Sequence, residues 1–461
     1  MASTRIMSSA GTCSRGHARP IPLDAPVTIA ARLASPEPTL RRAMRTPLTI
    51  MAVLAALLMG LWWLTGGDGE PPPPAAAAAP APAPVAEIAR RVEALRGLDF
   101  DEIPRPVSVT PEQARREGLE DLDRTYPEAR RLADEQVLKL LGLIDPSVDL
   151  RDVSASVFSE GVAGYYDPRT KRMRTVKGAA TGTRVLTEMV LAHELTHALE
   201  DQRYELGIAD QSGSDDAALA RLALVEGSAS ELMYAYARRH VTPEETLGGV
   251  LGSAFADTGS LPGFLQAQLV FPYTGGQAFI AALRERAGGR WSLVDLAERT
   301  RPPVSTEQIM HPGKWVAFEP PLPVRTDAAA ALGAGWERAS AGVLGEFQTR
   351  ELLSRAGGGG SAEAAAGWGG DRYELWRRDG DTECASPCRR DAALVARWRW
   401  DTPRDEREFA VKLRQWVRDG LGAVDGGDVA VAERDGEVTL AMAPTGELAR
   451  RLAAADRTAA G

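Results

Sequence analysis

The chain has 461 residues, a length that predicts two or three domains at about 150 residues each, and its 44% hydrophobic and 25% charged content is that of a folded protein. A net charge of −9 argues against a chain-wide basic surface, so no nucleic-acid partner is expected. Three cysteines are too few for a disulfide-built scaffold or for a four-cysteine zinc site.

The N-terminal region predicts a membrane anchor. Residues 1–47 have no regular pattern, whereas 48–65 contain an uncharged apolar run that would extend about 25 Å as a helix. The charged residues that flank this run place the following chain outside the cytoplasm: Arg41, Arg42 and Arg45 before it, Asp68 and Glu70 after it. The alternative to an anchor is a cleaved signal peptide, and the alternative to Met1 as the start of translation is Met44.

The rest of the sequence predicts two folded parts. A proline- and alanine-rich linker at 66–86 leads to a first domain at 87–325, in which most apolar residues recur three and four apart, as in helices. A second domain at 326–461 alternates strand and helix patterns around a glycine- and alanine-rich loop at 355–367. The predicted fold class is therefore α+β: a mostly helical domain followed by a small α+β domain.

The first domain also contains a predicted edge sheet. β character begins near residue 153, and a hairpin is predicted from Tyr165 to Val176 around the turn residues Asp-Pro. Two long helices are predicted next, over 183–206 and 217–240, with a polar loop between them.

The first of these helices contains the sequence His-Glu-Leu-Thr-His at 193–197. Two histidines four residues apart project from one helix face, so the imidazoles of His193 and His197 can bind one metal ion. The residue between them, Glu194, then lies beside a metal-bound water molecule and can take its proton. A surface pair of histidines is the alternative, but the neighbouring residues are uncharged, which favours a buried helix.

A catalytic zinc ion needs a third protein ligand, and Glu226 in the next helix is the best candidate. Its helical neighbours are apolar or small: Leu222, Ala223, Ala229 and Met233. A carboxylate on such a face is costly unless it is paired or bound to a cation, and an arginine partner is the alternative. His240 ends the helix and is expected to be a cap. Weaker candidates lie in the polar loop or off this face: Asp201, Glu205, Asp215, Asp216 and Glu231.

The stretches HELTHALEDQ and ALVEG resemble those of gluzincin-type zinc metallopeptidases. More closely, the chain is similar to bacterial, often membrane-anchored zincin-like proteins of unassigned substrate, through GYYDP, HELTHALEDQ, ALVEG, FPYTGGQAF, STEQIMHP and WGGDRY, which cover most of residues 155–415. The resemblance implies a zincin-like domain in which His193, His197 and Glu226 bind zinc, while Glu194 acts as general base and then general acid.

The resemblance also implies two features that the motif alone does not give. A strand edge beside the motif helix would align an extended substrate, and the predicted hairpin is the natural candidate for this strand. Well-studied gluzincins use a histidine or tyrosine to stabilise the oxyanion, and the sequence leaves three candidates open: His311, Tyr234 and Tyr273.

The sequence thus predicts a membrane-tethered, extracytoplasmic zinc metallopeptidase that cleaves a peptide, a protein or a cell-envelope component by Glu194-assisted attack of zinc-bound water. The alternative is a catalytically silent, zinc-stabilised envelope protein whose C-terminal domain binds a ligand through exposed tryptophans, although core packing is the simpler expectation for Trp368, Trp376, Trp398 and Trp400. Cys384 and Cys388 are predicted to form a local disulfide, and the oligomeric state is left open.

Overall fold

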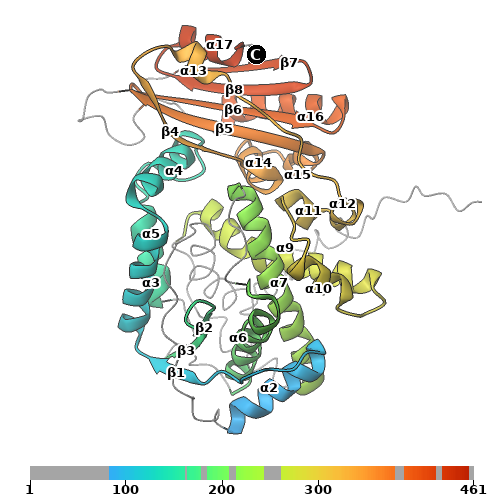
Figure 1. The fold of residues 1–461 in the computed structure, drawn as a ribbon. Coiled ribbons are helices and arrows are strands. Elements are labelled where there is room, and N and C mark those ends of the chain that lie inside the picture. Colours follow the sequence, from blue (N-terminus) through green and yellow to red (C-terminus); the bar gives the residue numbers. More distant parts are fainter. Residues whose placement is uncertain are drawn as a thin grey trace, which may run out of the picture. The chain divides into compact units, whose positions relative to one another are not determined.

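The computed structural model describes residues 83–160, 164–177, 184–206, 214–242, 261–378, 389–421 and 428–455. Within these ranges no helix has the length and apolar character needed to span a bilayer. The apolar segment at 48–65 and the pair Cys384 and Cys388 lie outside the described residues, so the anchor and the disulfide stay predictions. The described chain is α+β, as the sequence predicts, with helices around two separate sheets (Figure 1).

The first part of the described chain is mostly helical. Its elements in chain order are α2 (Ala83–Arg96), β1 (Pro106–Val109), α3 (Pro111–Thr125), α4 (Glu128–Leu140), α5 (Leu150–Glu160), β2 (Gly164–Asp167), β3 (Arg172–Val176), α6 (Arg184–Tyr204), α7 (Asp215–His240), α9 (Gly263–Arg286), α10 (Ser292–Arg299), α11 (Thr306–Met310) and α12 (Pro312–Ala317). The long predicted helices are α6 and α7, which carry the candidate metal ligands.

A three-stranded sheet with the order β1-β3-β2 lies beside α6. β2 and β3 form the predicted hairpin and pair antiparallel, with Tyr165 opposite Arg174. β1 pairs parallel with β3, a strand that the sequence did not predict. Among the described residues β2 has no strand on its other side, and it reaches α6 where a Cβ on Gly164 would lie 3.6 Å from Val190. The sheet therefore presents an edge strand to the helix that carries the histidine pair.

Residues 150–160 form α5, so the prediction of β character from residue 153 is wrong for this segment. The β-branched Val153 and Val157 favour a strand locally, but they are four residues apart and so lie on one helix face. Val157 is buried against Leu122 of α3. Asp149 accepts two backbone N–H groups at the start of the helix, at 2.7 and 3.0 Å. Packing and this N-terminal cap outweigh the weak strand propensity.

The helices α6, α7 and α9 form the core around the candidate site. α7 and α9 approach each other at two glycines: a Cβ on Gly227 would lie 2.3 Å from the carbonyl carbon of Gly276. Only glycine permits such a close backbone approach. Because Gly227 directly follows Glu226, the contact holds α9 against the segment of α7 that carries this carboxylate.

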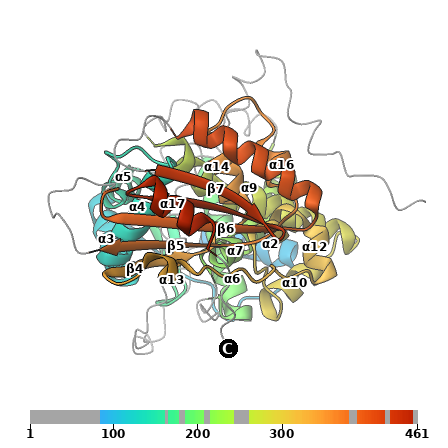
Figure 2. The ribbon, with the colours of Figure 1, turned by 90° about the horizontal axis from the view of Figure 1, so that it is seen from above.

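The C-terminal part forms a five-stranded antiparallel sheet with the order β4-β5-β6-β8-β7 (Figures 1 and 2). α13 and α17 pack on one face of the sheet, and α14, α15 and α16 on the other. Its elements are α13 (Ala328–Leu332), β4 (Trp336–Gly342), α14 (Gly345–Ser354), α15 (Ser361–Ala365), β5 (Trp368–Arg378), β6 (Ala392–Trp400), α16 (Pro403–Gln415), a π-helical turn (Trp416–Gly420), β7 (Asp428–Arg434), β8 (Glu437–Ala443) and α17 (Gly446–Ala453). The segment predicted as a loop at 355–367 thus contains a short helix, α15.

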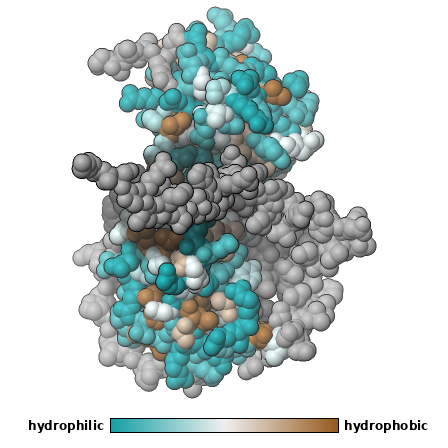
Figure 3. All heavy atoms as spheres, turned by 90° about the vertical axis from the view of Figure 1, so that its right-hand side faces the viewer, coloured by the Kyte–Doolittle hydropathy of each residue, from teal (hydrophilic) through white to brown (hydrophobic). Residues whose placement is uncertain are grey.

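The tryptophans of this part pack into its interior. Trp368, Trp398 and Trp400 are buried in the core on the α16 side, and Trp376 is partly buried on the opposite side. These side chains therefore contribute packing, the simpler of the two expectations, rather than an exposed ligand surface. On the face shown in Figure 3, the described surface is mostly hydrophilic, with hydrophobic side chains in separate groups.

Several contacts join the C-terminal sheet to the helices that carry the candidate site. Asp216, in the first turn of α7, accepts hydrogen bonds from the backbone N–H and the hydroxyl of Thr306 in α11, at 3.1 and 2.5 Å, and the oxygen of that hydroxyl accepts from the backbone N–H of Phe347 in α14, at 3.2 Å. Gly345, at the start of α14, lies against the same carboxylate, where a Cβ would come within 1.8 Å of its Oδ1. Val137 of α4 belongs to the core of the C-terminal sheet. The domain boundary expected after residue 325 stays a prediction.

Candidate metal centre

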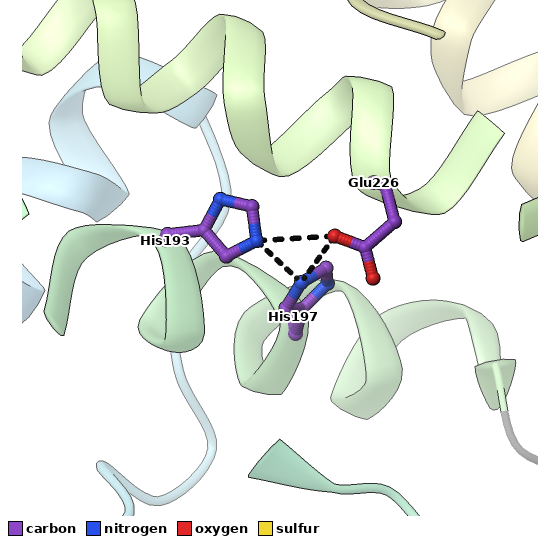
Figure 4. Close-up of side chains that lie close together, drawn as sticks. All are labelled: His193, His197 and Glu226. Carbon is purple, nitrogen blue, oxygen red and sulfur yellow. Dashed lines mark hydrogen bonds and ion pairs between the residues drawn. The ribbon is translucent and has the colours of Figure 1, made fainter. Parts of the chain in front are cut away.

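His193 and His197 lie one turn apart in α6, and their imidazoles point to the same place (Figure 4). The two Nε2 atoms are 3.0 Å apart, and the side chains are 6% and 1% exposed. Residues 192–200 are all buried, which agrees with the uncharged surroundings of the motif. The histidine pair is therefore an interior feature and not a pair on the protein surface.

Glu226 reaches the same point from α7 (Figure 4). Its Oε2 lies 3.2 Å from His193 Nε2 and 3.5 Å from His197 Nε2, and the residue is fully buried. Burial by itself would raise the pKa of Glu226, but the nearby His197 and His193 outweigh it and lower the pKa to about 2. No arginine pairs with Glu226 among the described residues, so the histidines are its partners there.

The donor set and its spacing fit zinc. The three donor atoms are 3.0, 3.2 and 3.5 Å apart, and ligand atoms about 2.1 Å from a tetrahedral zinc ion would be separated by about 3.4 Å. Two imidazoles and one carboxylate leave the fourth position open, which is the pattern of catalytic and not of structural zinc sites. Glu226 Oε1 and His197 Nδ1 have no hydrogen-bond partner in the described part of the chain, so the cluster is not already satisfied by protein groups.

Glu194 lies beside the cluster and is buried. The backbone N–H of Tyr166 in β2 is directed at its carboxylate and favours the charged form. Burial raises the pKa of Glu194 to about 8, the charge of Glu226 adds to the increase, and His193 opposes it. Its Oε2 has no partner among the described residues. A carboxyl group with a pKa near neutrality can both accept and return a proton at neutral pH.

Tyr273 of α9 is the oxyanion candidate that lies at the cluster. Its ring is stacked on that of His193, with the centroids 6.0 Å apart and an interplanar angle of 27°. The side chain is buried, and its hydroxyl faces the Glu226 carboxylate without a hydrogen bond of normal geometry. Burial and the charges of Glu226 and Glu194 raise the pKa of Tyr273 well above its ordinary value, so the phenol keeps its proton and can donate it in a hydrogen bond.

The other two oxyanion candidates and His240 have different surroundings. His311 lies between α11 and α12, and its Nε2 is 2.8 Å from Glu346 Oε1. Tyr234 is exposed on α7. His240 is the last residue of α7, directly before the C-cap residue Val241, and its ring lies 5.0 Å from that of Tyr236. Of the three oxyanion candidates, Tyr273 is the one whose ring contacts a histidine of the cluster.

The weaker ligand candidates have other partners or are exposed. Asp201 accepts from Tyr166 and Lys171, Asp215 pairs with Arg130, Asp216 with Thr306 and Glu231 with Arg284, whereas Glu205 is exposed. A second group of acids within metal-binding distance of one another surrounds an ammonium group instead: Lys314 Nζ contacts Glu307, Glu319 and Asp401. Among the described residues, the cluster of His193, His197 and Glu226 is therefore the better candidate metal site.

Tyr166 is the site residue that sequence reasoning missed. Successive residues of β2 point to opposite sides, so Tyr165 contacts Glu117 of α3 whereas Tyr166 packs toward α6. The hydroxyl of Tyr166 donates to Asp201 at 2.8 Å, and its N–H reaches Glu194. In the sequence, the two adjacent tyrosines of GYYDP indicate that the strand directs one of them to each side. The sequence does not reveal which of the two faces α6.

Comparison with known proteins covers the C-terminal part alone. A family model described as a domain of unknown function (DUF8575) matches residues 332–453, which form the second sheet and its helices. The matched segment does not include the histidine cluster. No curated protein and no solved structure matches the chain.

Proposed function

We propose that the chain is a zinc-dependent metallopeptidase of the gluzincin type that hydrolyses peptide bonds. The observation that supports this most strongly is the buried convergence of His193, His197 and Glu226, whose donor atoms lie within 3.5 Å of one another beside Glu194. A membrane tether and an extracytoplasmic location, inferred from residues 48–65 and their flanks, belong to the same proposal.

Each residue of the site has a role in this reaction. When bound by His193, His197 and Glu226, zinc supplies a Lewis acid that acidifies water and polarises a carbonyl group. The Glu194 carboxylate takes a proton from the attacking water and returns it to the departing amine. The Tyr166 N–H holds that carboxylate in place. The Tyr273 hydroxyl, which faces the cluster beside Glu226, donates a hydrogen bond to the carbonyl oxygen as it becomes negative.

The edge of β2 favours a peptide as the substrate. An extended peptide can add to an exposed strand edge through main-chain hydrogen bonds. β2 has no strand on one side among the described residues, although Gly164, Tyr165 and Tyr166 are buried, and the N–H of Tyr166 is directed at Glu194. A peptide along this edge would pass next to the proposed general base.

The decisive variant is Glu194→Gln, which keeps the size of the side chain and removes the base. We expect zinc content to stay at one ion per chain while cleavage of a random peptide library, followed by mass spectrometry, falls by about 10²–10⁴-fold. Glu188→Gln is the matched control, since Glu188 lies on the same helix but contacts Tyr236 instead of the cluster. Undiminished cleavage by Glu194→Gln would overturn the proposal.

A further inference from the structure

We propose that a pocket between α4, α5, α7, α9 and the start of α14 receives one apolar side chain of the substrate, of about the size of leucine or phenylalanine. The C-terminal part of the chain would thereby help to select which peptide is cut. This inference rests on the proposed peptidase function and adds a substrate preference to it.

The pocket has a volume of about 170 Å³ and walls from both parts of the chain. Aliphatic side chains form most of its lining: Val137, Leu138, Leu150, Val153, Leu219, Leu222, Leu265, Leu269, Val343 and Leu344. The last two belong to the segment that matches the domain of unknown function. The pocket thus lies where the core around the candidate site meets the core of the C-terminal sheet.

The polar groups at one end of the pocket already have protein partners. Arg130 pairs with Asp215 at 2.6 Å, and Asp134 accepts from Tyr126 at 2.9 Å. Tyr373 of the C-terminal sheet lies 3.3 Å from Asp215. These groups form a closed network, so they do not call for a charged ligand. The rest of the lining is mostly aliphatic, with Ser154, Gln268 and Gln348 as its other polar residues.

Two helices connect the pocket to the candidate metal centre. Leu222 lines the pocket and is four residues before Glu226 in α7; Leu269 lines it and is four residues before Tyr273 in α9. Residues four apart lie on one helix face, about 6 Å apart along the axis. A substrate held at the metal centre therefore has the pocket one helical turn away, within reach of a neighbouring side chain.

The volume and the lining define the class of group that enters. An apolar cavity of about 150 Å³ is large enough to bind benzene, so about 170 Å³ accommodates a leucine or phenylalanine side chain. Gln268 also lines the pocket, and its Oε1 is buried without a partner among the described residues. This oxygen can accept a hydrogen bond from a substrate N–H next to the apolar side chain.

The test uses Val343→Trp, which fills the pocket from the C-terminal side without changing a residue of the metal centre. The matched control is Val411→Trp, because Val411 is 70% exposed on α16 and does not line the pocket. Cleavage kinetics are measured on two peptides that differ at one position beside the cut bond, with phenylalanine in one and alanine in the other. Toluene is titrated calorimetrically into the wild type as a probe that needs no variant.

We expect the wild type to prefer the phenylalanine peptide, Val343→Trp to lose about tenfold of that preference in kcat/KM, and Val411→Trp to keep it. Toluene should bind the wild type and inhibit cleavage of the phenylalanine peptide more than that of the alanine peptide. Two results would overturn the pocket assignment and leave the proposed function intact. One is Glu194-dependent cleavage with the same peptide preference in Val343→Trp and Val411→Trp. The other is Glu194-dependent cleavage that toluene does not inhibit selectively. Absence of Glu194-dependent cleavage in the wild type would instead overturn the proposed function.

Discussion

Gly276 of α9 lies against Ala223 of α7 so closely that a Cβ on Gly276 would come within 1.9 Å of the Ala223 carbonyl oxygen. Ala223 is three residues before Glu226, and Gly276 is three residues after Tyr273. One glycine contact therefore fixes the distance between the helix that carries the proposed third ligand and the helix that carries the proposed oxyanion donor.

Gly276→Ala should separate α7 from α9. Because the new methyl group meets backbone and not a flexible side chain, we expect a loss of about 1–3 kcal/mol in the free energy of unfolding, together with weaker zinc binding. Chemical denaturation and metal titration measure the two effects. Gly263→Ala is the control on the same helix, since a Cβ there meets no atom within 4 Å. Equal stability and equal zinc affinity in Gly276→Ala and Gly263→Ala would contradict the account of this contact.

Tyr273→Phe should lower the rate of catalysis without lowering the stability of the protein. The hydroxyl faces the Glu226 carboxylate without a hydrogen bond of normal geometry, so its removal should leave the stability of the protein nearly unchanged, with zinc still bound. If the hydroxyl stabilises the oxyanion, kcat should fall by about 10²-fold or more. In the control variant Tyr236→Phe, the lost hydroxyl contacts Arg91 and Glu188 away from the cluster, so stability should fall while kcat is kept. Unchanged kcat in Tyr273→Phe would show that the hydroxyl does not stabilise the oxyanion.

His311→Gln should change the pH dependence of stability and leave catalysis intact. The hydrogen bond to Glu346 raises the pKa of His311, with further support from the charges of Glu346 and Glu307, while burial and Lys314 oppose the increase. The folded state therefore binds this proton more tightly than the unfolded state, whose histidine pKa is about 6.5. The stabilisation is fully present below about pH 6.5 and is lost as pH rises through the higher folded value.

The measurement is urea denaturation of zinc-free wild type and His311→Gln across this pH range. The difference between them should be largest at acidic pH and shrink as pH rises, by less than about 1 kcal/mol in total, because the imidazole is 42% exposed. A difference that does not depend on pH would show that the His311–Glu346 pair contributes no proton linkage. A large loss of turnover would return His311 to the list of oxyanion candidates.

The sequence predicts those features that depend on local periodicity. A helix is enough to bring the imidazoles of His193 and His197 to one face. Glu226 was identifiable as a ligand candidate because its helix face is otherwise apolar. Both inferences place the residues in the helices where the structure has them, and the structure brings their donor atoms together. The hairpin was predictable for the same reason, because its strands are adjacent in sequence.

Contacts between distant segments could not be predicted in this way. β1 pairs with β3 across more than sixty residues of intervening chain, and nothing in its four residues indicates the partner. Arg96 is another example: its guanidinium is buried and bonded to Glu200, Asp295 and Glu298, which come from α6 and α10. Such interactions depend on which helix faces pack together, and the sequence pattern leaves that open.

The central claim is that His193, His197 and Glu226 hold one zinc ion, and metal content tests it most directly. Mass spectrometry of the metal should find about one zinc per chain in the wild type, and a large loss in both His197→Ala and Glu226→Ala. Glu231→Ala is the control, because Glu231 is a buried carboxylate of the same helix that pairs with Arg284 and not with the histidines. Retention of zinc in both ligand variants, or no zinc in the wild type after reconstitution, would contradict the account.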